Sequence, residues 1–198
     1  LLILLGDLID RGPDAPGVIE LAIDLQSRTN AFAIQGNHEQ MMLESRDSED
    51  ATGMWFMSGG LAVVESYQPA DHGPDQPRVP RLSDDDDGEG STVALPWADW
   101  VPESHWAFFE SMREFVETPT HIFLHAYLPP DVTTSDATIF DLRWRKLPRD
   151  PSEHRSGKTL VVGHTQQPQS KPRSWGHLLA LDTGAYNGGW LTACDVRS

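Results

Sequence analysis

Short apolar runs that end in polar, chemically versatile side chains recur along this chain. The first run, Leu1–Leu5, leads through Gly6 to Asp7, and the second, Ala31–Gln35, leads to Asn37. Apolar runs of this length, bounded by glycine, are typical of buried strands. Open α/β sheets bind ligands at the carboxyl ends of their strands, so we expect both polar side chains at such an edge.

Two later runs repeat the pattern. His121–Leu124 is followed by His125, and Leu160–Val162 is followed by a glycine and then His164. If these strands are parallel neighbours of the first two, the four polar side chains converge on one rim. A mixture of oxygen and imidazole ligands suits Mn, Fe or Zn better than Mg or Ca. The predicted metal ligands are therefore Asp7, Asn37, His125 and His164.

The segments between the runs have helical periodicity. Apolar residues spaced as on one helix face predict a helix over 16–28, which joins the first two strands into a βαβ unit with parallel strands. Further helices are expected over 39–44 and 101–112. Met54, Trp55 and Met57 are expected to lie on the buried face of another helix, which is interrupted by two glycines.

The C-terminal third is expected to form a mostly antiparallel second sheet. Its predicted segments are 139–144 as a strand or loop edge, and 158–162, 177–182 and 190–195 as strands. Tyr186 lies in the glycine-rich turn that precedes the last of these segments. We expect it to pack in that turn, although it could also approach a substrate.

Composition narrows the class of protein. A chain of 198 residues fits one domain, and a net charge of −15 argues against a nucleic-acid partner, which needs a basic face. Segment 68–100 is rich in proline and contains the run DDDDGEG, which predicts an exposed acidic insert. His72 and His105 have no ligand partners in the sequence pattern and are expected on the surface.

Nothing in the sequence indicates secretion or a membrane span. Cys194 is the only cysteine, so no internal disulfide can form, and its alternating context predicts a core position. No apolar run approaches membrane-spanning length, and no signal peptide is visible. These features predict a cytoplasmic protein with no membrane partner.

The motifs GDLIDRG at 6–12, GNHE at 36–39, His125-Ala126 and GHT at 163–165 resemble the successive signatures of the calcineurin-like metallophosphoesterases. More narrowly, they resemble the bacterial serine/threonine-phosphatase-like branch, which is similar to the lambda-phage phosphatase and the symmetrical diadenosine-tetraphosphate hydrolases. The resemblance implies an α/β fold, an αββα sandwich of two mixed β-sheets flanked by helices, over residues 1–198.

The same resemblance implies two divalent metal ions. Asp7 would bridge them, and Asn37, His125 and His164 would complete one site. Relatives supply the other site with an Asp-x-His signature that lies upstream of this stretch. We therefore expect an N-terminally truncated chain in which one site is incomplete, so that it binds one ion well and hydrolyses little.

Further residues match the catalytic and phosphate-binding positions of the family. His38 follows Asn37 directly and can face the leaving group, and the resemblance supports its pairing with Asp10 as a general acid. Arg11 resembles a phosphate-clamping arginine, with a salt bridge to Asp10 as the alternative. At the position of a second clamp the chain has Lys146, and the neighbouring Arg145 is the preferred substitute.

These features predict a metal-dependent phosphomonoesterase, serine/threonine protein phosphatase-like, which acts on a phosphorylated protein or a small phosphoester. No second histidine stands two positions after His164, where many nuclease and phosphodiesterase relatives have one, so the resemblance implies phosphomonoesters or polyphosphates over nucleic-acid diesters. Dinucleotide-cleaving relatives often have another residue in place of Asp10, so the resemblance also favours a phosphatase over the first alternative, a dinucleoside polyphosphate hydrolase. The second alternative is a non-catalytic phosphate-binding domain, should the upstream motif be truly absent.

Overall fold

The computed structural model describes residues 1–69 and 97–196. Its helices are α1 (Ala15–Arg28), α2 (Asn37–Ser45), α3 (Glu49–Trp55), α4 (Leu61–Tyr67), α5 (Glu103–Ser111) and α6 (Ile139–Arg143). Its strands are β1 (Leu2–Leu4), β2 (Ala31–Ala33), β3 (Phe115–Glu117), β4 (His121–Leu124), β5 (Thr159–Val162), β6 (Arg173–Ser174) and β7 (Leu178–Ala180). None of the described helices is long and apolar enough to cross a membrane.

The N-terminal βαβ unit forms as predicted. β1 pairs in parallel with β2, with Leu4 opposite Ala33. Asp14 caps α1, because its carboxylate accepts a hydrogen bond from the backbone N–H of Gly17, and Pro16 occupies the first turn. Both strands therefore deliver the residues that follow them to the same edge.

The larger sheet has five strands in the order β3-β4-β5-β7-β6. Its three central strands, β4, β5 and β7, are parallel, and the edge strands β3 and β6 are antiparallel. The expectation of a mostly antiparallel sheet is therefore wrong, because the chain crosses over between β4, β5 and β7. Parallel central strands place His125 and His164, which follow β4 and β5, at one edge.

Two other predicted strands differ in the structure. Segment 139–144 is largely helix α6, because the hydroxyl of Thr138 and the carboxylate of Asp141 cap its first turn reciprocally. Segment 190–195 contains no strand, and only Trp190 forms isolated bridges, with Thr183 and Gly184.

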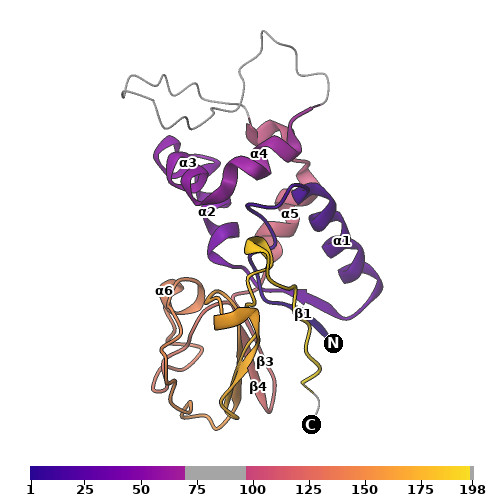
Figure 1. Ribbon diagram of the computed structural model, residues 1–198. Helices are drawn as coiled ribbons and strands as arrows, with labels where there is room; N and C mark the ends of the chain where they lie inside the picture. Colours follow the sequence, from indigo (N-terminus) through magenta and orange to yellow (C-terminus); the bar gives the residue numbers. More distant parts are fainter. Residues whose placement is uncertain (70–96, 197–198) are drawn as a thin grey trace, which may run out of the picture.

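The two sheets pack face to face between helices. One apolar cluster joins β1 and β2 to helices α1 to α5, and a second lies between the sheets around Ile34, Phe123 and Val161. A third covers the other face of the large sheet, where Leu142 of α6 packs. Figure 1 shows α1 to α5 in one half of the molecule and α6 beside β3 and β4 in the other. The layer order confirms the α/β class and the expected sandwich, although the smaller sheet is purely parallel.

Several burial predictions are wrong. Met54 and Met57 are exposed, and of the three only Trp55, the last residue of α3, is fully buried; a π-turn over Phe56–Gly60 follows it. His105 is buried and bonded to the hydroxyl of Tyr67, with 2.7 Å between the ring nitrogen and the oxygen. Cys194 is exposed, since its segment joins no sheet. Most of the predicted acidic insert, residues 70–96, lies outside the described residues.

Candidate metal and phosphate site

The loop that follows β1 has an unusual backbone. Asp7, Asp10 and Arg11 all have positive φ angles, of 54°, 72° and 62°. Non-glycine residues rarely adopt this conformation, and clusters of it occur where the surrounding structure fixes a functional geometry. Gly6 adopts φ 90°, and a Cβ atom there would lie 2.6 Å from the backbone nitrogen of Gly36. Glycine at this position therefore lets the first two motifs touch.

The side chain of Glu39 connects the GDLIDRG and GNHE motifs by hydrogen bonds. Its carboxylate is fully buried and accepts hydrogen bonds from the backbone N–H groups of Asp7, at 2.9 Å, and Gly36, at 2.8 Å, as well as from Leu8. Burial, assisted by the charge of Asp7, raises the pKa of Glu39. This role of Glu39 is not among those predicted from the motifs, although a Glu three positions after a helix N-cap is a recognisable capping signal.

The predicted metal ligands meet at one point. His125 Nε2 lies 3.3 Å from Asp7 Oδ1 and 3.1 Å from Asn37 Oδ1. One ligand atom from each of Asp7, His125 and His164 lies within 4.8 Å of the others, which is within reach of a single ion. Within the described residues, these form the one cluster of three or more His, Cys, Asp or Glu side chains able to hold a metal.

Hydrogen bonds orient both imidazoles for a cation. His125 Nδ1 lies 2.7 Å from the carbonyl oxygen of Leu5, and His164 Nε2 lies 3.0 Å from that of Trp144. Each ring must donate its N–H to that carbonyl, which leaves the lone pair of the other nitrogen free for a metal. The donor set therefore fits a divalent ion.

The charges of the cluster are strongly coupled. Burial opposes the charged form of Asp7, but His125 and His38 together outweigh burial and lower the pKa of Asp7. Burial also favours neutral His125, but Asp7, with the Leu5 carbonyl and Glu39, outweighs burial and raises the pKa of His125. Burial, together with His125 and Lys146, lowers the pKa of His164 to about 4. Asp7 is thus anionic and His164 neutral at neutral pH, as metal ligation requires.

His38 and Asp10 form a buried pair beside this cluster. His38 Nδ1 contacts Asp10 Oδ2, and the indole N–H of Trp55 donates to both carboxylate oxygens of Asp10, at 3.0 and 3.2 Å. Burial raises the pKa of Asp10. The backbone N–H of His38 also donates to Asp7 Oδ1, at 3.2 Å, so the pair is tied directly to a predicted metal ligand. Trp55 was expected only as core, and its link to Asp10 was missed.

The candidate phosphate-binding residues Arg11 and Arg145 have different side-chain partners. Arg11 is exposed, and its Nη2 donates to His38 Nε2 at 3.1 Å. Within the described residues it forms no ion pair with Asp10, the alternative left open by the sequence. Arg145 is engaged by Asp141, with 2.6 Å between Nε and Oδ1, and it covers the ring of Phe140.

Lys146 is exposed and lies close enough to His164 to lower its pKa. Of the two residues considered for the second clamp, Lys146 acts electrostatically on His164, whereas Arg145 is paired with Asp141 of α6. The preference for Arg145 is not supported by this geometry.

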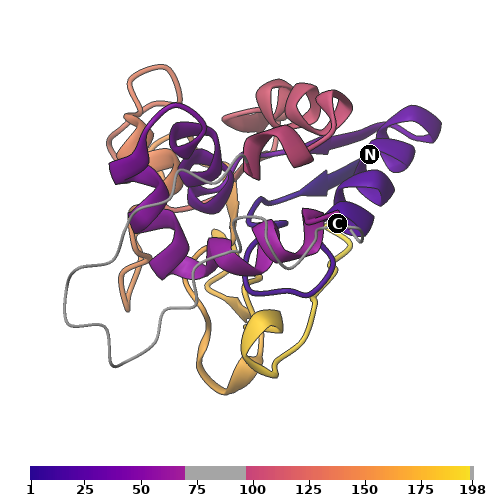
Figure 2. The same cartoon turned by 90° about the horizontal axis from the view of Figure 1, so that it is seen from above.

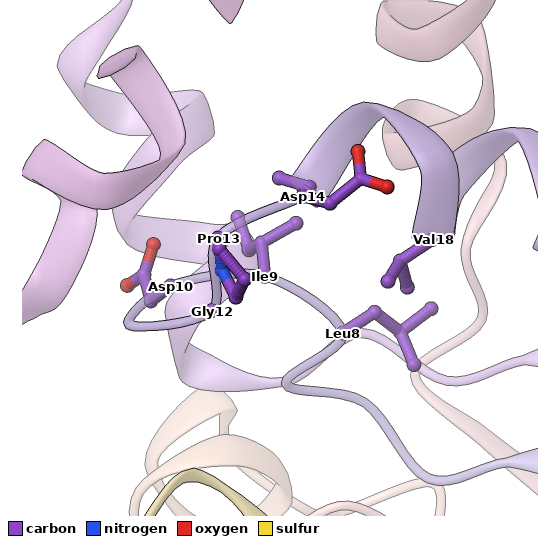
Figure 3. Close-up of a pocket in the computed structure, with 8 residues that line it drawn as sticks. Leu8, Ile9, Asp10, Gly12, Pro13, Asp14 and Val18 are labelled. Atoms are coloured by element: carbon purple, nitrogen blue, oxygen red, sulfur yellow. The ribbon is translucent and has the colours of Figure 1, made fainter. Parts of the chain in front are cut away.

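A small open hollow of about 120 Å³ adjoins the other side of the same loop. Figure 3 shows Leu8 and Val18 facing each other there, with the carboxylate of Asp10 turned away from them. The hollow is mostly apolar and is lined by none of the four predicted metal ligands. It does not coincide with the metal cluster.

The sequence model of the family described as "Calcineurin-like phosphoesterase" matches residues 1–188. Serine/threonine-protein phosphatase 1 of Salmonella typhimurium is 47% identical over 202 aligned positions, which cover 100% of this chain and 79% of that protein. Serine/threonine-protein phosphatase 2 of Escherichia coli is 42% identical over 60 positions, 30% of this chain and 25% of that protein.

The fold also resembles a solved structure, a crystal structure titled as a diadenosine tetraphosphatase. The TM-score is 0.57, the sequence identity 17%, and the match covers 95% of this chain and 72% of the other. At this identity the likeness supports the fold alone.

Proposed function

The chain belongs to the calcineurin-like phosphoesterase family, and we propose on that premise that it removes phosphate from phosphorylated serine or threonine side chains of proteins. It is a hydrolase of phosphoester bonds that uses divalent metal ions. Support for a protein substrate comes from the 47% identity to a serine/threonine-protein phosphatase across the whole of this chain. The observation that carries the chemistry is the meeting of Asp7, Asn37 and His125 beside the His38–Asp10 pair.

Asp7, Asn37, His125 and His164 would hold the metal. A bound divalent ion polarises the phosphoryl group and supplies a water nucleophile at neutral pH. We propose Mn, Fe or Zn, because the donor set mixes oxygen and imidazole nitrogen. We also propose a dinuclear centre with Asp7 as the bridging ligand, since a carboxylate offers two oxygens.

The remaining residues handle the phosphate and the proton. When protonated, His38 Nε2, which accepts a hydrogen bond from Arg11 in this structure, would deliver a proton to the leaving serine or threonine oxygen, while Asp10 holds the other ring nitrogen and stabilises the charged imidazole. Trp55 fixes the carboxylate of Asp10 by its N–H. Arg11 and Lys146 would neutralise the phosphate oxygens, Arg11 by its planar fork and Lys146 as a point charge.

The test measures the hydrolysis of different substrates at saturating Mn²⁺. It is done with the 198-residue chain and, separately, with the full-length product of its gene. A phosphoserine peptide should be hydrolysed with higher kcat/KM than diadenosine tetraphosphate, and His38→Ala should lower kcat by about 10²–10⁴-fold. Faster cleavage of the dinucleotide would support the dinucleoside polyphosphate hydrolase instead. Phosphate binding without hydrolysis by either protein would support the non-catalytic alternative.

A further inference from the structure

Tyr186 lies over the guanidinium group of Arg11. The Arg11 Cζ atom is 4.3 Å from the centre of the Tyr186 ring. The two residues come from opposite ends of the chain, and both Figure 1 and Figure 2 place the C-terminal turn around Tyr186 (yellow) beside the loop that follows β1 (indigo). The sequence pattern predicts that Tyr186 packs within its own turn, but in the structure its side chain reaches a candidate phosphate-binding residue.

The turn that carries Tyr186 is firmly built. Gly184 and Gly188 flank it with φ angles of 70° and 73°, which glycine adopts without strain. The Tyr186 hydroxyl donates to Gln166 Oε1 at 3.2 Å, and the Asp182 carboxylate accepts from the Gly184 N–H at 2.9 Å. A Cβ atom on Gly184 would collide with the Gln166 side chain, 2.1 Å from Nε2. The ring is therefore anchored to the segment that follows His164.

Arg11 is held from two further directions. Its backbone N–H donates to the carbonyl of Gly59 at 3.1 Å, and its Nη2 donates to His38. A Cβ atom on Gly59 would lie 2.6 Å from Arg11 Cγ, so the side chain lies directly against that glycine. The Tyr186 ring adds a third contact, at the guanidinium carbon itself.

An aromatic ring is a suitable support for a phosphate-binding arginine. A guanidinium group donates its hydrogen bonds in its own plane, whereas a ring stacks on its face. The stacked ring restricts the orientation of the group without using any of its donors. A carboxylate partner would restrict it too, but would compete with phosphate for the same N–H groups.

We propose that Tyr186 is a positioning residue, which holds the Arg11 guanidinium group in the orientation that binds the substrate phosphate. The assignment rests on the proposed phosphate-binding role of Arg11. An exposed cation–π contact of this kind corresponds to an affinity change of about 2–5-fold. The effect should appear in phosphate binding and KM, with kcat changing less.

The experiment measures the Kd of inorganic phosphate by calorimetry and the KM for a phosphoserine peptide, both with Mn²⁺. The variants are Tyr186→Leu, Tyr186→Phe, Arg11→Ala and the double variant with Arg11→Ala and Tyr186→Leu. Trp190→Leu is the matched control, because Trp190 is an exposed aromatic residue of the same turn whose ring makes no aromatic or cation–π contact among the described residues. Thermal unfolding of every variant checks that it folds.

Tyr186→Leu should weaken phosphate binding and raise KM by about 2–5-fold, whereas Tyr186→Phe, which keeps the ring, and Trp190→Leu should change either value by less. In the Arg11→Ala background, Tyr186→Leu should add nothing, because the two residues act as one unit. Additive losses, or equal losses from the Phe and Leu variants, would overturn the proposal. An inactive wild type would count against the proposed function, while phosphate binding would still test Tyr186.

Discussion

Trp55 donates its indole N–H to Asp10, 45 residues earlier in the chain, and Asp10 in turn contacts His38. Trp55→Phe keeps an aromatic ring but leaves the buried carboxylate without this donor. We expect kcat to fall about 10-fold, because a hydrogen bond to a charged group is worth about 1.5–3 kcal/mol. The pKa of Asp10, already raised by burial, should rise further, so the pH–rate profile should shift.

A second buried tryptophan provides the control. Trp106 packs in the same apolar cluster, but its indole N–H donates to the carbonyl of Ala98, at 3.3 Å. Trp106→Phe should lower the unfolding temperature without changing the pH–rate profile. Equal kinetic effects from both variants would show that Trp55 acts only through packing.

The contact between Trp55 and Asp10 is one feature of the site that the pattern of apolar and polar residues does not predict. The rim of Asp7, Asn37, His125 and His164 could be predicted because strand ends of parallel neighbours meet at one edge. Trp55 could not, since its contact with Asp10 joins residues 45 positions apart and the apolar pattern of α3 predicts only burial. The same pattern predicted buried Met54 and Met57, which are exposed.

The parallel pairing of β4, β5 and β7 in the larger sheet could not be predicted from the sequence either. Pairing of β5 with β7 rather than with β6 depends on contacts between distant segments, and apolar runs do not encode the direction of a neighbour. The choice of helix for Ile139–Arg143 was available from the reciprocal cap of Thr138 and Asp141, a signal that the apolar pattern obscured.

Loss of His125 should abolish tight metal binding. We expect wild-type chain to bind one Mn²⁺ ion tightly at the described cluster, and His125→Ala to weaken that binding by more than about 100-fold, since even residues that support metal ligands are worth about 10–100-fold. His121→Ala, on the same strand but bonded to Thr120, is the control and should bind normally. Isothermal titration calorimetry measures both, and unchanged affinity of His125→Ala would refute the assignment.

Metal affinity should rise with pH. Burial favours neutral His125, but Asp7, with the Leu5 carbonyl and Glu39, outweighs it and raises the pKa of His125 above the ordinary 6.5, so a proton competes with the metal. His164, with a pKa of about 4, stays neutral in the same range and contributes no slope. The Kd for Mn²⁺ should therefore fall as the pH rises toward the raised pKa of His125, with release of about one proton per ion, and should level off above that pKa. A flat affinity between about pH 6 and 8 would contradict the coupling of Asp7 and His125.

Glu39→Gln should damage both stability and metal binding. The buried carboxylate accepts three backbone hydrogen bonds, and an amide would place an N–H against one of these donors. We expect a loss of about 1–3 kcal/mol in the free energy of unfolding, measured by urea denaturation, and weaker Mn²⁺ binding because Asp7 loses its backbone support. Glu44→Gln on the same helix, where the exposed carboxylate accepts a side-chain hydrogen bond from Gln40, should leave both unchanged.

Lys146 and Arg145 are adjacent but should give opposite phenotypes. Lys146 lies near His164, so Lys146→Ala should raise the KM for a phosphoserine peptide by about 2–5-fold, a modest effect because the side chain is exposed. Lys146→Arg should restore the KM, since the charge returns. Arg145→Ala instead breaks the ion pair with Asp141 and should lower the unfolding temperature while the KM stays near that of wild type. The reverse outcome, a raised KM for Arg145→Ala alone, would show that Arg145 leaves Asp141 to bind phosphate and that the clamp follows the sequence expectation after all.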